Sequence, residues 1–392
     1  MMTFNYRCTI CSASYEIRPE YTVCPHCAPN QKTDQPLHGI LEVELHGPAS
    51  DKFNIAELLP IEPEFFPPIP VGNTPLWEPR RLREFTGLKQ LFIKDDGTNP
   101  TASFKDRASC LVSAAARKFN INEITLASTG NAGSSMAGIG AAAGQHINLF
   151  LPESAPPAKL IQALQYGARV FRVNGNYDKA YDLSLIYSHL KGGMNRNTAY
   201  NPLTIEGKKT VSLELFAQLD RAPDAVFVSV GDGCILAGVY KGFKDLLQLG
   251  YIGEVPKIFG VQAETSDALF RAFHCGVFET IPTSTVADSI CVDVPRNGAH
   301  ALSLLKTYGG EMMTVSDQEI LEAQSELSRT VGLFTEPAGA AAYAGLRKAI
   351  GALGPDSLIV VLTTGNGLKD TGSAALGVEV PEQCIDTIDD II

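Results

Sequence analysis

Lys105 lies in a sequence context that suits a reactive amine. Residues 99–103 form a tight, proline-bearing loop, Lys105 follows almost at once, and the alanine-rich run 108–119 predicts a helix. A lysine held between a turn and a helix start is rigid and lies close to the interior. It can therefore lose its proton and form a Schiff base with an aldehyde cofactor. The same arrangement also suits a surface lysine before a helix, so both interpretations stay open on this feature alone.

Four cysteines near the N-terminus have the spacing of a metal site. Cys8 pairs with Cys11 and Cys24 with Cys27, each pair with two residues between its members. Two such pairs can each hold one side of a tetrahedral ion, and four thiolates favour a structural zinc because no open position remains. We predict a zinc-ribbon-like segment over residues 1–45, with a short hairpin between the two pairs. A redox pair and four free thiols are the alternatives.

Apolar runs alternate with helical runs after residue 121, which predicts a parallel sheet with helices on its faces. The predicted strands are 91–94, 124–128, 147–151, 168–173, 198–201, 225–230, 257–261 and 357–362. The predicted helices are 108–119, 132–144, 158–166, 177–190, 236–249, 316–331 and 337–350. The proline-rich stretch 46–72 predicts an extended connector lying on another surface.

Three glycine-bearing loops, 128–134, 231–238 and 363–368, follow predicted strands. In such sheets, ligands bind where loops leave the carboxyl ends of the strands. The first two loops also begin helices, whose free backbone N–H groups attract anions. Taken alone, each of these loops is explained equally well as an ordinary helix cap. They support a ligand site only in combination with Lys105.

The lysine loop resembles the cofactor segment of the threonine synthases. Asn-Pro-Thr-Ala-Ser-Phe-Lys-Asp-Arg at 99–107 departs from the family pattern only at Ala102. Gly-Asn-Thr-Pro-Leu at 72–76 and Thr-Gly-Asn-Gly-Leu-Lys-Asp at 364–370 match further segments, and the resemblance covers about 70–375. It implies pyridoxal 5'-phosphate as cofactor and the α/β class of fold type II. Two doubly wound parallel or mixed-sheet domains then hold the cofactor in the cleft between them.

The resemblance also implies domain bounds and residue roles. The large cofactor-binding domain is expected at 46–107 and 202–392, and the small α/β domain at 108–201. Lys105 is expected to be the catalytic residue that carries the cofactor. The expected cofactor-binding residues are Asn131, Gly231, Asp232, Gly233, Cys234, Ile235 and Thr364. The expected substrate-binding residues are Ser128, Thr129, Thr101, Ser103, Lys94 and Thr204.

Departures from the family pattern bear on the substrate. The phosphate loop carries Asp232 where the family shows asparagine, and an acidic group near a phosphate is repulsive unless it turns away or meets a cation. Thr204 stands where the family has arginine, the natural bidentate partner of a phosphate group, and Thr198 and Ala199 replace an asparagine and a serine. These changes weaken the expected site for a substrate phosphate.

We predict a pyridoxal-phosphate-dependent lyase acting on an amino acid, first of all a threonine synthase that converts O-phosphohomoserine and water to threonine and phosphate. The alternative is an elimination or β-replacement enzyme of the ammonia-lyase or dehydratase type, acting on a non-phosphorylated amino acid. A third hypothesis is a cofactor-binding or zinc-mediated interaction protein without turnover, which the Lys105, Asn131 and Thr364 motifs disfavour.

Composition restricts the partners. The 392 residues, 45% of them apolar and 35 of them glycine, suit a multidomain α/β enzyme. A net charge of −11 without a basic patch disfavours nucleic acid and anionic membranes, and no apolar run is long enough for a membrane span. No signal-peptide pattern begins the chain, and only nine cysteines occur, which favours a cytoplasmic setting. The resemblance implies a homodimer.

Overall fold

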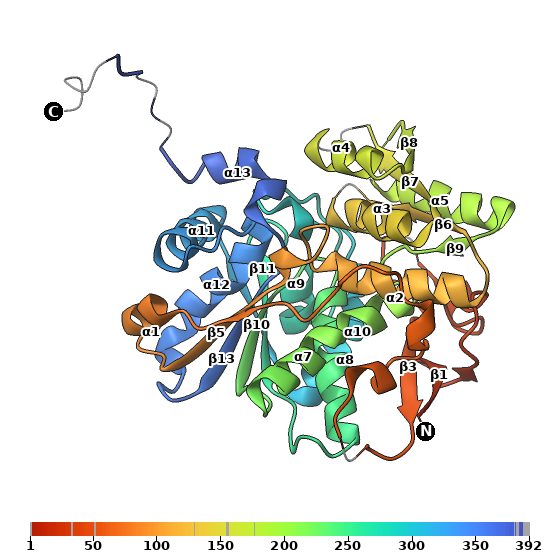
Figure 1. Ribbon diagram of the computed structural model, residues 1–392, viewed down its shortest axis with the longest axis horizontal. Coiled ribbons are helices and arrows are strands. Elements are labelled where there is room, and N and C mark those ends of the chain that lie inside the picture. Colours follow the sequence, from red (N-terminus) through yellow and green to blue (C-terminus); the bar gives the residue numbers. More distant parts are fainter. Residues whose placement is uncertain are drawn as a thin grey trace.

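Two sheets form the body of the molecule, and a third, small sheet contains the N-terminal segment (Figure 1). The computed structural model describes residues 2–32, 34–50, 52–128, 130–153, 157–175, 177–379, 381 and 384–386. In this part of the chain, no helix combines the length and the hydropathy needed to cross a bilayer.

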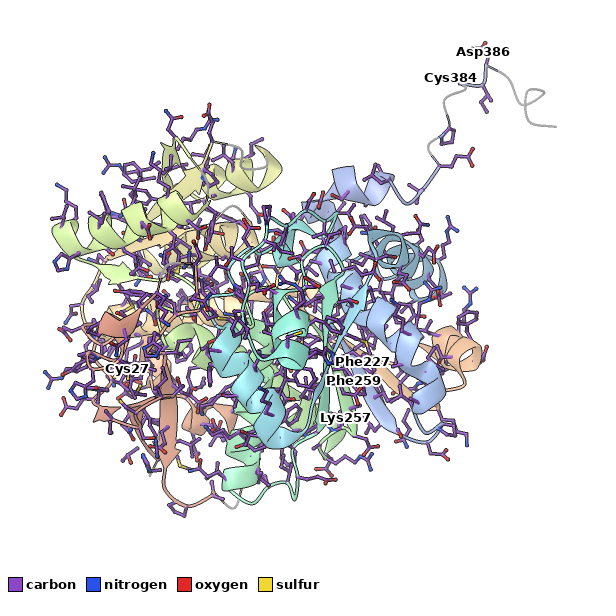
Figure 2. All side chains as sticks on the ribbon, turned by 180° about the vertical axis from the view of Figure 1, so that it is seen from behind. Cys27, Phe227, Lys257, Phe259, Cys384 and Asp386 are labelled. Carbon is purple, nitrogen blue, oxygen red and sulfur yellow. The ribbon has the colours of Figure 1, made fainter. Side chains whose placement is uncertain are left out.

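The larger sheet has the strand order β12-β11-β10-β13-β5-β4 and is parallel except for β4, which runs antiparallel to β5. Its strands are β4 (Leu76–Trp77), β5 (Gln90–Asp95), β10 (Ala225–Ser229), β11 (Lys257–Ala263), β12 (Glu311–Val315) and β13 (Leu358–Thr363). The central strands β10 and β13 are buried along their whole length, as expected for parallel strands covered on both faces. Figure 2 shows Phe227 and Phe259 together on neighbouring strands, with ring centroids 4.5 Å apart.

Helices cover both faces of this sheet and create two large apolar cores, one containing β10 and α8, the other β13 and α12. The helices are α1 (Arg80–Thr86), α7 (Thr210–Leu219), α8 (Cys234–Gln248), α9 (Ala268–Cys275), α10 (Gly298–Tyr308), α11 (Asp317–Val331), α12 (Pro337–Ala349) and α13 (Thr371–Ala375). Both cores place their apolar side chains against strands whose ends carry the candidate loops.

The smaller sheet has the order β8-β7-β6-β9 and is wholly parallel. Its strands are β6 (Glu123–Ala127), β7 (His146–Pro152), β8 (Arg169–Val173) and β9 (Met194–Asn195), and its helices are α3 (Asn131–Ala143), α4 (Pro157–Gln165) and α5 (Tyr177–Lys191). All four strands lie within 108–201, and the larger sheet takes none from there. Helix α2 (Lys105–Lys118) packs against both α3 and α6 (Leu203–Lys208), and so joins the two halves (Figure 1). The domain bounds themselves stay a prediction.

The N-terminal sheet has the order β2-β1-β3, formed by β1 (Thr3–Cys8), β2 (Ser14–Tyr15) and β3 (Leu41–His46). The proline-rich stretch is extended, with two short turns, and its apolar side chains pack on the core around α2, as the sequence predicts. The single-turn 3-10 helices are η1 (Ala28–Asn30), η2 (Ile55–Leu58), η3 (Pro63–Phe65), η4 (Asp96–Thr98), η5 (Asp288–Ile290), η6 (Ile350–Ala352) and η7 (Gly367–Lys369).

Two local predictions are wrong. No strand forms at 198–201, because Ala199 has a φ of +65°, a left-handed conformation that a strand does not use. The fourth strand of the smaller sheet is β9 instead. The hairpin expected within 12–23 is also absent, because β2 pairs back onto β1, and Val23 bridges to Ile40.

Candidate active site

The lysine loop is joined to the loop after β13 by backbone hydrogen bonds. Phe104 N donates to Thr364 O at 2.8 Å, and Asn366 N donates to Ala102 O at 3.0 Å. Ser103 lies opposite Gly365 in an antiparallel bridge. Ala102, the departure from the family pattern, has a φ of +66°, where glycine is favoured. These contacts fix the position of Lys105 at the first residue of α2.

The electrostatic surroundings make Lys105 easy to deprotonate. Burial is the largest effect and lowers the pKa of its amine, although the residue keeps some exposed surface. Asp232 and Glu336 raise this pKa, and Arg196 lowers it further. Only an uncharged amine can attack an aldehyde, and a lowered pKa increases the uncharged fraction, so it suits covalent attachment of a cofactor.

The two residues after Lys105 brace it. Asp106 accepts hydrogen bonds from the backbone N and the hydroxyl of Thr101. Arg107 is completely buried and binds the carboxylates of Asp96 and Glu214, in contacts of 2.5–2.9 Å. Asp106 and Arg107 thus brace the lysine loop, and the Thr101 hydroxyl is engaged within the protein.

The loop at the start of α8 has the backbone of an anion cradle. Gly233 has a φ of +86°, and a Cβ there would lie 2.9 Å from Ala301 Cβ; a Cβ at Gly231 would lie 3.0 Å from Ile290 Cα. Gly233 therefore requires glycine, whereas a side chain at Gly231 would be tightly packed against Ile290. Asp232 Oδ1 accepts a hydrogen bond from Cys234 N at 2.9 Å, so this acidic side chain occupies a donor that a phosphate group could use. The loop fits a phosphate once that N–H is released.

Asn131 and Glu336 connect the two halves of the molecule across the site. Asn131 Nδ2 donates to both carboxylate oxygens of Glu336, at 2.8 and 2.9 Å. Asn131 Oδ1 is buried without a hydrogen-bond partner among the described residues, which suits a group that meets a ligand. Ser128 Oγ accepts from Gly130 N and Gly133 N and thus caps α3. Thr129 lies outside the described residues.

Ser103 and Thr364 lie together near Lys105. Ser103 Oγ is buried, and within the described part of the chain it has no partner. Thr364 is 6% exposed, and its carbonyl oxygen accepts a hydrogen bond from Phe104 N. At Gly365 a Cβ would lie 2.3 Å from Glu336 Oε1, so only glycine lets this loop approach Glu336. Unpartnered hydroxyl and amide oxygens around one amine fit a polar cofactor.

Two expected substrate-binding residues have their polar groups engaged within the protein. Lys94 is fully buried, and its Nζ contacts Glu214 Oε2 and Thr74 O, each at 2.7 Å. Thr204 donates its hydroxyl to Asn201 O at 2.7 Å. Their roles in substrate binding therefore have no support in these contacts, whereas bracing explains both.

Two buried cations near the site, Arg196 and Lys208, are not among the site residues expected from the sequence. Both are about 1% exposed, and both act electrostatically on each other and on Cys234. Asn297 was also missed: its N donates to Asp232 O, and its Nδ2 donates to Gly233 O at 3.1 Å. The fourth strand is predicted at 198–201, so Arg196 is not recognised from the sequence as the residue that directly follows a strand, here β9.

The four N-terminal cysteines come together. Their sulfur atoms all lie within 4.8 Å of one another, with Cys8 and Cys27 at 3.8 Å and Cys11 and Cys24 at 3.6 Å. Four sulfurs at these separations match one tetrahedral ion with zinc–sulfur bonds of about 2.3 Å. The segment is labelled by Cys27 in Figure 2.

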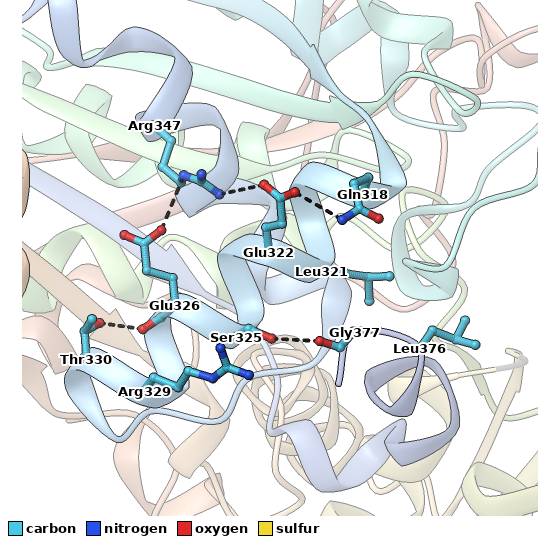
Figure 3. A pocket seen from close by; sticks show the side chains of 10 residues that line it. All are labelled: Gln318, Leu321, Glu322, Ser325, Glu326, Arg329, Thr330, Arg347, Leu376 and Gly377. Atoms are coloured by element: carbon cyan, nitrogen blue, oxygen red, sulfur yellow. Dashed lines mark hydrogen bonds and ion pairs between the residues drawn. The ribbon is translucent and has the colours of Figure 1, made fainter. Parts of the chain in front are cut away.

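A separate cavity of about 460 Å³ lies beside α11 and α13 (Figure 3). Several of its polar side chains are engaged within the protein: Arg347 contacts Glu322 and Glu326, and Ser325 Oγ donates to Gly377 O. None of the predicted site residues lines it, so this cavity is not the lysine site.

Comparison with known proteins agrees with a pyridoxal-phosphate site at Lys105. Residues 69–365 match the family model described as pyridoxal-phosphate dependent enzyme. A threonine synthase of Methanosarcina acetivorans is 35% identical over 388 residues, covering 94% of this chain and 92% of the relative. The chain belongs to the threonine synthase family of pyridoxal-phosphate dependent enzymes. The predicted family, cofactor and lyase class are thereby confirmed.

Further relatives agree with this assignment. A threonine synthase of Methanocaldococcus jannaschii is 38% identical over 319 residues, covering 79% of this chain and 78% of the relative. The processed threonine deaminase isoform 2 of Solanum lycopersicum has a TM-score of 0.67 at 23% identity, covering 78% of this chain and 86% of that one. This structural similarity supports the α/β fold alone.

Proposed function

We propose that the protein is a threonine synthase, converting O-phosphohomoserine and water to threonine and phosphate. The observation that carries the proposal is the position of Lys105, an amine of lowered pKa between the glycine loop of α8 and the loop after β13. Relatives of 35% and 38% identity bear the name threonine synthase and align over most of the chain.

The residues around Lys105 would have different roles in binding the cofactor and in proton transfer. Pyridoxal phosphate, when bound, supplies a ring that stores the electron pair released at the substrate Cα. Loop 231–235 would hold its phosphate, and Thr364 and Asn131 would bind its ring. Lys105 would carry it and then move protons at the substrate Cα and Cβ. A threonine hydroxyl does not hold the ring nitrogen protonated, which favours elimination and replacement over transamination.

A second candidate is elimination from a non-phosphorylated amino acid, as an ammonia-lyase or dehydratase carries it out. The hydrogen bond from Thr204 to Asn201 O favours it, because position 204 then offers no donor to a substrate phosphate.

Two assays test the proposal. Borohydride reduction followed by peptide mapping should label Lys105, and Lys105→Ala should abolish both the label and the visible cofactor absorbance. The wild-type enzyme should release phosphate and form threonine from O-phosphohomoserine. Ammonia and a keto acid from serine, threonine or a diamino acid, without phosphohomoserine turnover, would favour the second candidate. A label on another lysine would overturn the assignment of the site.

We also propose that Cys8, Cys11, Cys24 and Cys27 bind a structural zinc ion. The convergence of four sulfurs within 4.8 Å supports this, and four protein ligands leave no position for catalysis. The segment has little core of its own, so the metal would contribute to its folding. A homodimer and a cytoplasmic setting remain proposals, which the resemblance and the cysteine content support.

A further inference from the structure

A buried arginine near Lys105 has no anionic partner among the described residues. Arg196 follows β9 and is 1% exposed, and its N donates to Thr125 O at 2.8 Å. Its guanidinium makes two long contacts with hydroxyls, to Thr198 Oγ1 at 3.2 Å and Ser109 Oγ at 3.4 Å, and its Nε has no partner in the described part of the chain. Burial lowers the pKa of Arg196 to about 10.

Three other buried cations of this protein have carboxylate partners. Lys209 and Lys241, both about 1% exposed or less, form ion pairs with Glu206 and Asp245. Arg107 is bound by two carboxylates. Leaving a buried charge unpaired is costly, so an unpaired guanidinium indicates a ligand that completes the pairing.

Lys208 is the second cation without a carboxylate partner among the described residues. Its Nζ donates only to Thr204 O, at 3.0 Å, and burial lowers its pKa to about 8. A Cβ at Gly238 would lie 2.4 Å from Lys208 Cβ, so Lys208 packs against the beginning of α8. This is the side of the cleft that carries the phosphate loop.

Arg196 also contacts helix α2. Ser109, its partner, lies on α2 one turn after Lys105, and Ser135 of α3 donates to the Ser109 hydroxyl. Lys208 therefore lies with the cofactor-phosphate loop, whereas Arg196 lies between that loop, whose Cys234 and Asp232 act on it electrostatically, and the helix that carries the reactive amine.

We propose that Arg196 binds a second anion, distinct from the cofactor phosphate: the phosphate ester on the side chain of the substrate. This inference rests on the proposed function and assigns its specificity-determining residue. A planar guanidinium suits a phosphate group because it can donate two parallel hydrogen bonds.

The test compares the holoenzymes of wild type, Arg196→Gln, Arg196→Lys and Arg221→Gln, a control whose arginine is half exposed in a surface pair with Asp224. Inorganic phosphate binding is measured by calorimetry and needs no turnover. We expect Arg196→Gln to weaken phosphate binding about 10- to 100-fold and to raise KM for O-phosphohomoserine similarly, with kcat less affected. Arg196→Lys should fall between, and the control should match wild type.

Stability and cofactor affinity supply a second readout. Because Arg196→Gln removes an unpaired buried charge, it should unfold at the same temperature as wild type or higher when phosphate is absent. Added phosphate should raise the Tm of wild type but not of the variant. The Kd for pyridoxal phosphate should change less than about threefold in Arg196→Gln, whereas Lys208→Gln should raise it about tenfold.

The outcomes separate the two proposals. If the wild type does not turn over O-phosphohomoserine but binds phosphate through Arg196, the proposed function fails and the anion site stands. If the wild-type holoenzyme binds no phosphate, or Arg196→Gln leaves that binding unchanged, the inference is wrong. A large loss of cofactor affinity or of folding in Arg196→Gln would also overturn it, since Arg196 would then serve the cofactor or the core.

Discussion

Replacing Arg107 with methionine tests whether the ion-pair cluster beside Lys105 holds the lysine loop. The guanidinium binds Asp96 and Glu214, and both carboxylates are buried. Burial by itself would raise the pKa of Glu214, but Arg107 and then Lys94 outweigh burial and lower the pKa to about 2, from an ordinary 4.5. This difference corresponds to about 3 kcal/mol, since each tenfold change in proton affinity is worth about 1.4 kcal/mol.

In Arg107→Met, Lys94 remains beside Glu214, which reduces the loss of stability. Asp96, however, is left without its arginine, which increases the loss of stability. We expect Arg107→Met to lower the free energy of unfolding by about 3–5 kcal/mol at pH 7. Arg107→Lys should lose less, because it keeps the charge but not the forked geometry. The surface variant Arg221→Met should lose under about 1 kcal/mol.

Urea unfolding of the cofactor-free proteins, followed by circular dichroism, measures these differences. The pH dependence gives a second check. Since the pKa of Glu214 is lower in the folded state, its stabilisation is present above pH 4.5 and is lost as the pH falls toward 2. The gap between wild type and Arg107→Met should therefore narrow between pH 5 and pH 3. A loss below about 1 kcal/mol, or a gap that does not change with pH, would refute the reasoning.

Three further predictions concern the phosphate loop and the cysteines. Glu42 contacts His300 at 3.0 Å, and Asn297, three residues before His300, donates a hydrogen bond to Gly233 O. Glu42→Gln should therefore raise the Kd for pyridoxal phosphate about 2- to 10-fold, measured by fluorescence titration, with an unchanged far-ultraviolet circular dichroism spectrum. An unaltered Kd would exclude an effect of Glu42 on the phosphate loop through His300 and Asn297. Gly233→Ala should raise the same Kd about tenfold, because alanine at a φ of +86° costs about 1–2 kcal/mol, and wild-type affinity would contradict the cradle. Elemental analysis should find one zinc per chain, and removing it with a chelator should lower the Tm, whereas a metal-free protein of full stability would contradict the zinc site.

The sequence by itself determined the elements that have strong periodicity or complete motifs. The alternation of apolar runs and helices predicts both parallel sheets, and the elements from β5 to β13 that the sequence predicts lie within a few residues of their expected ends, except the fourth strand of the smaller sheet. The segment around Lys105 identifies the family and the cofactor because its chemistry is contained in nine consecutive residues. The cysteine spacing likewise predicts the cluster, since each pair is local.

Only the tertiary structure decided how the polar groups are paired. Lys94 and Arg196 are both buried cations, yet Lys94 meets Glu214 from 120 residues away and Arg196 meets no carboxylate among the described residues. Periodicity reports which face of an element is buried, whereas the partner of a buried charge depends on how distant elements pack. For this reason, the buried cations near Lys105 could be found only after α2, α6, α8 and β9 had been placed against one another.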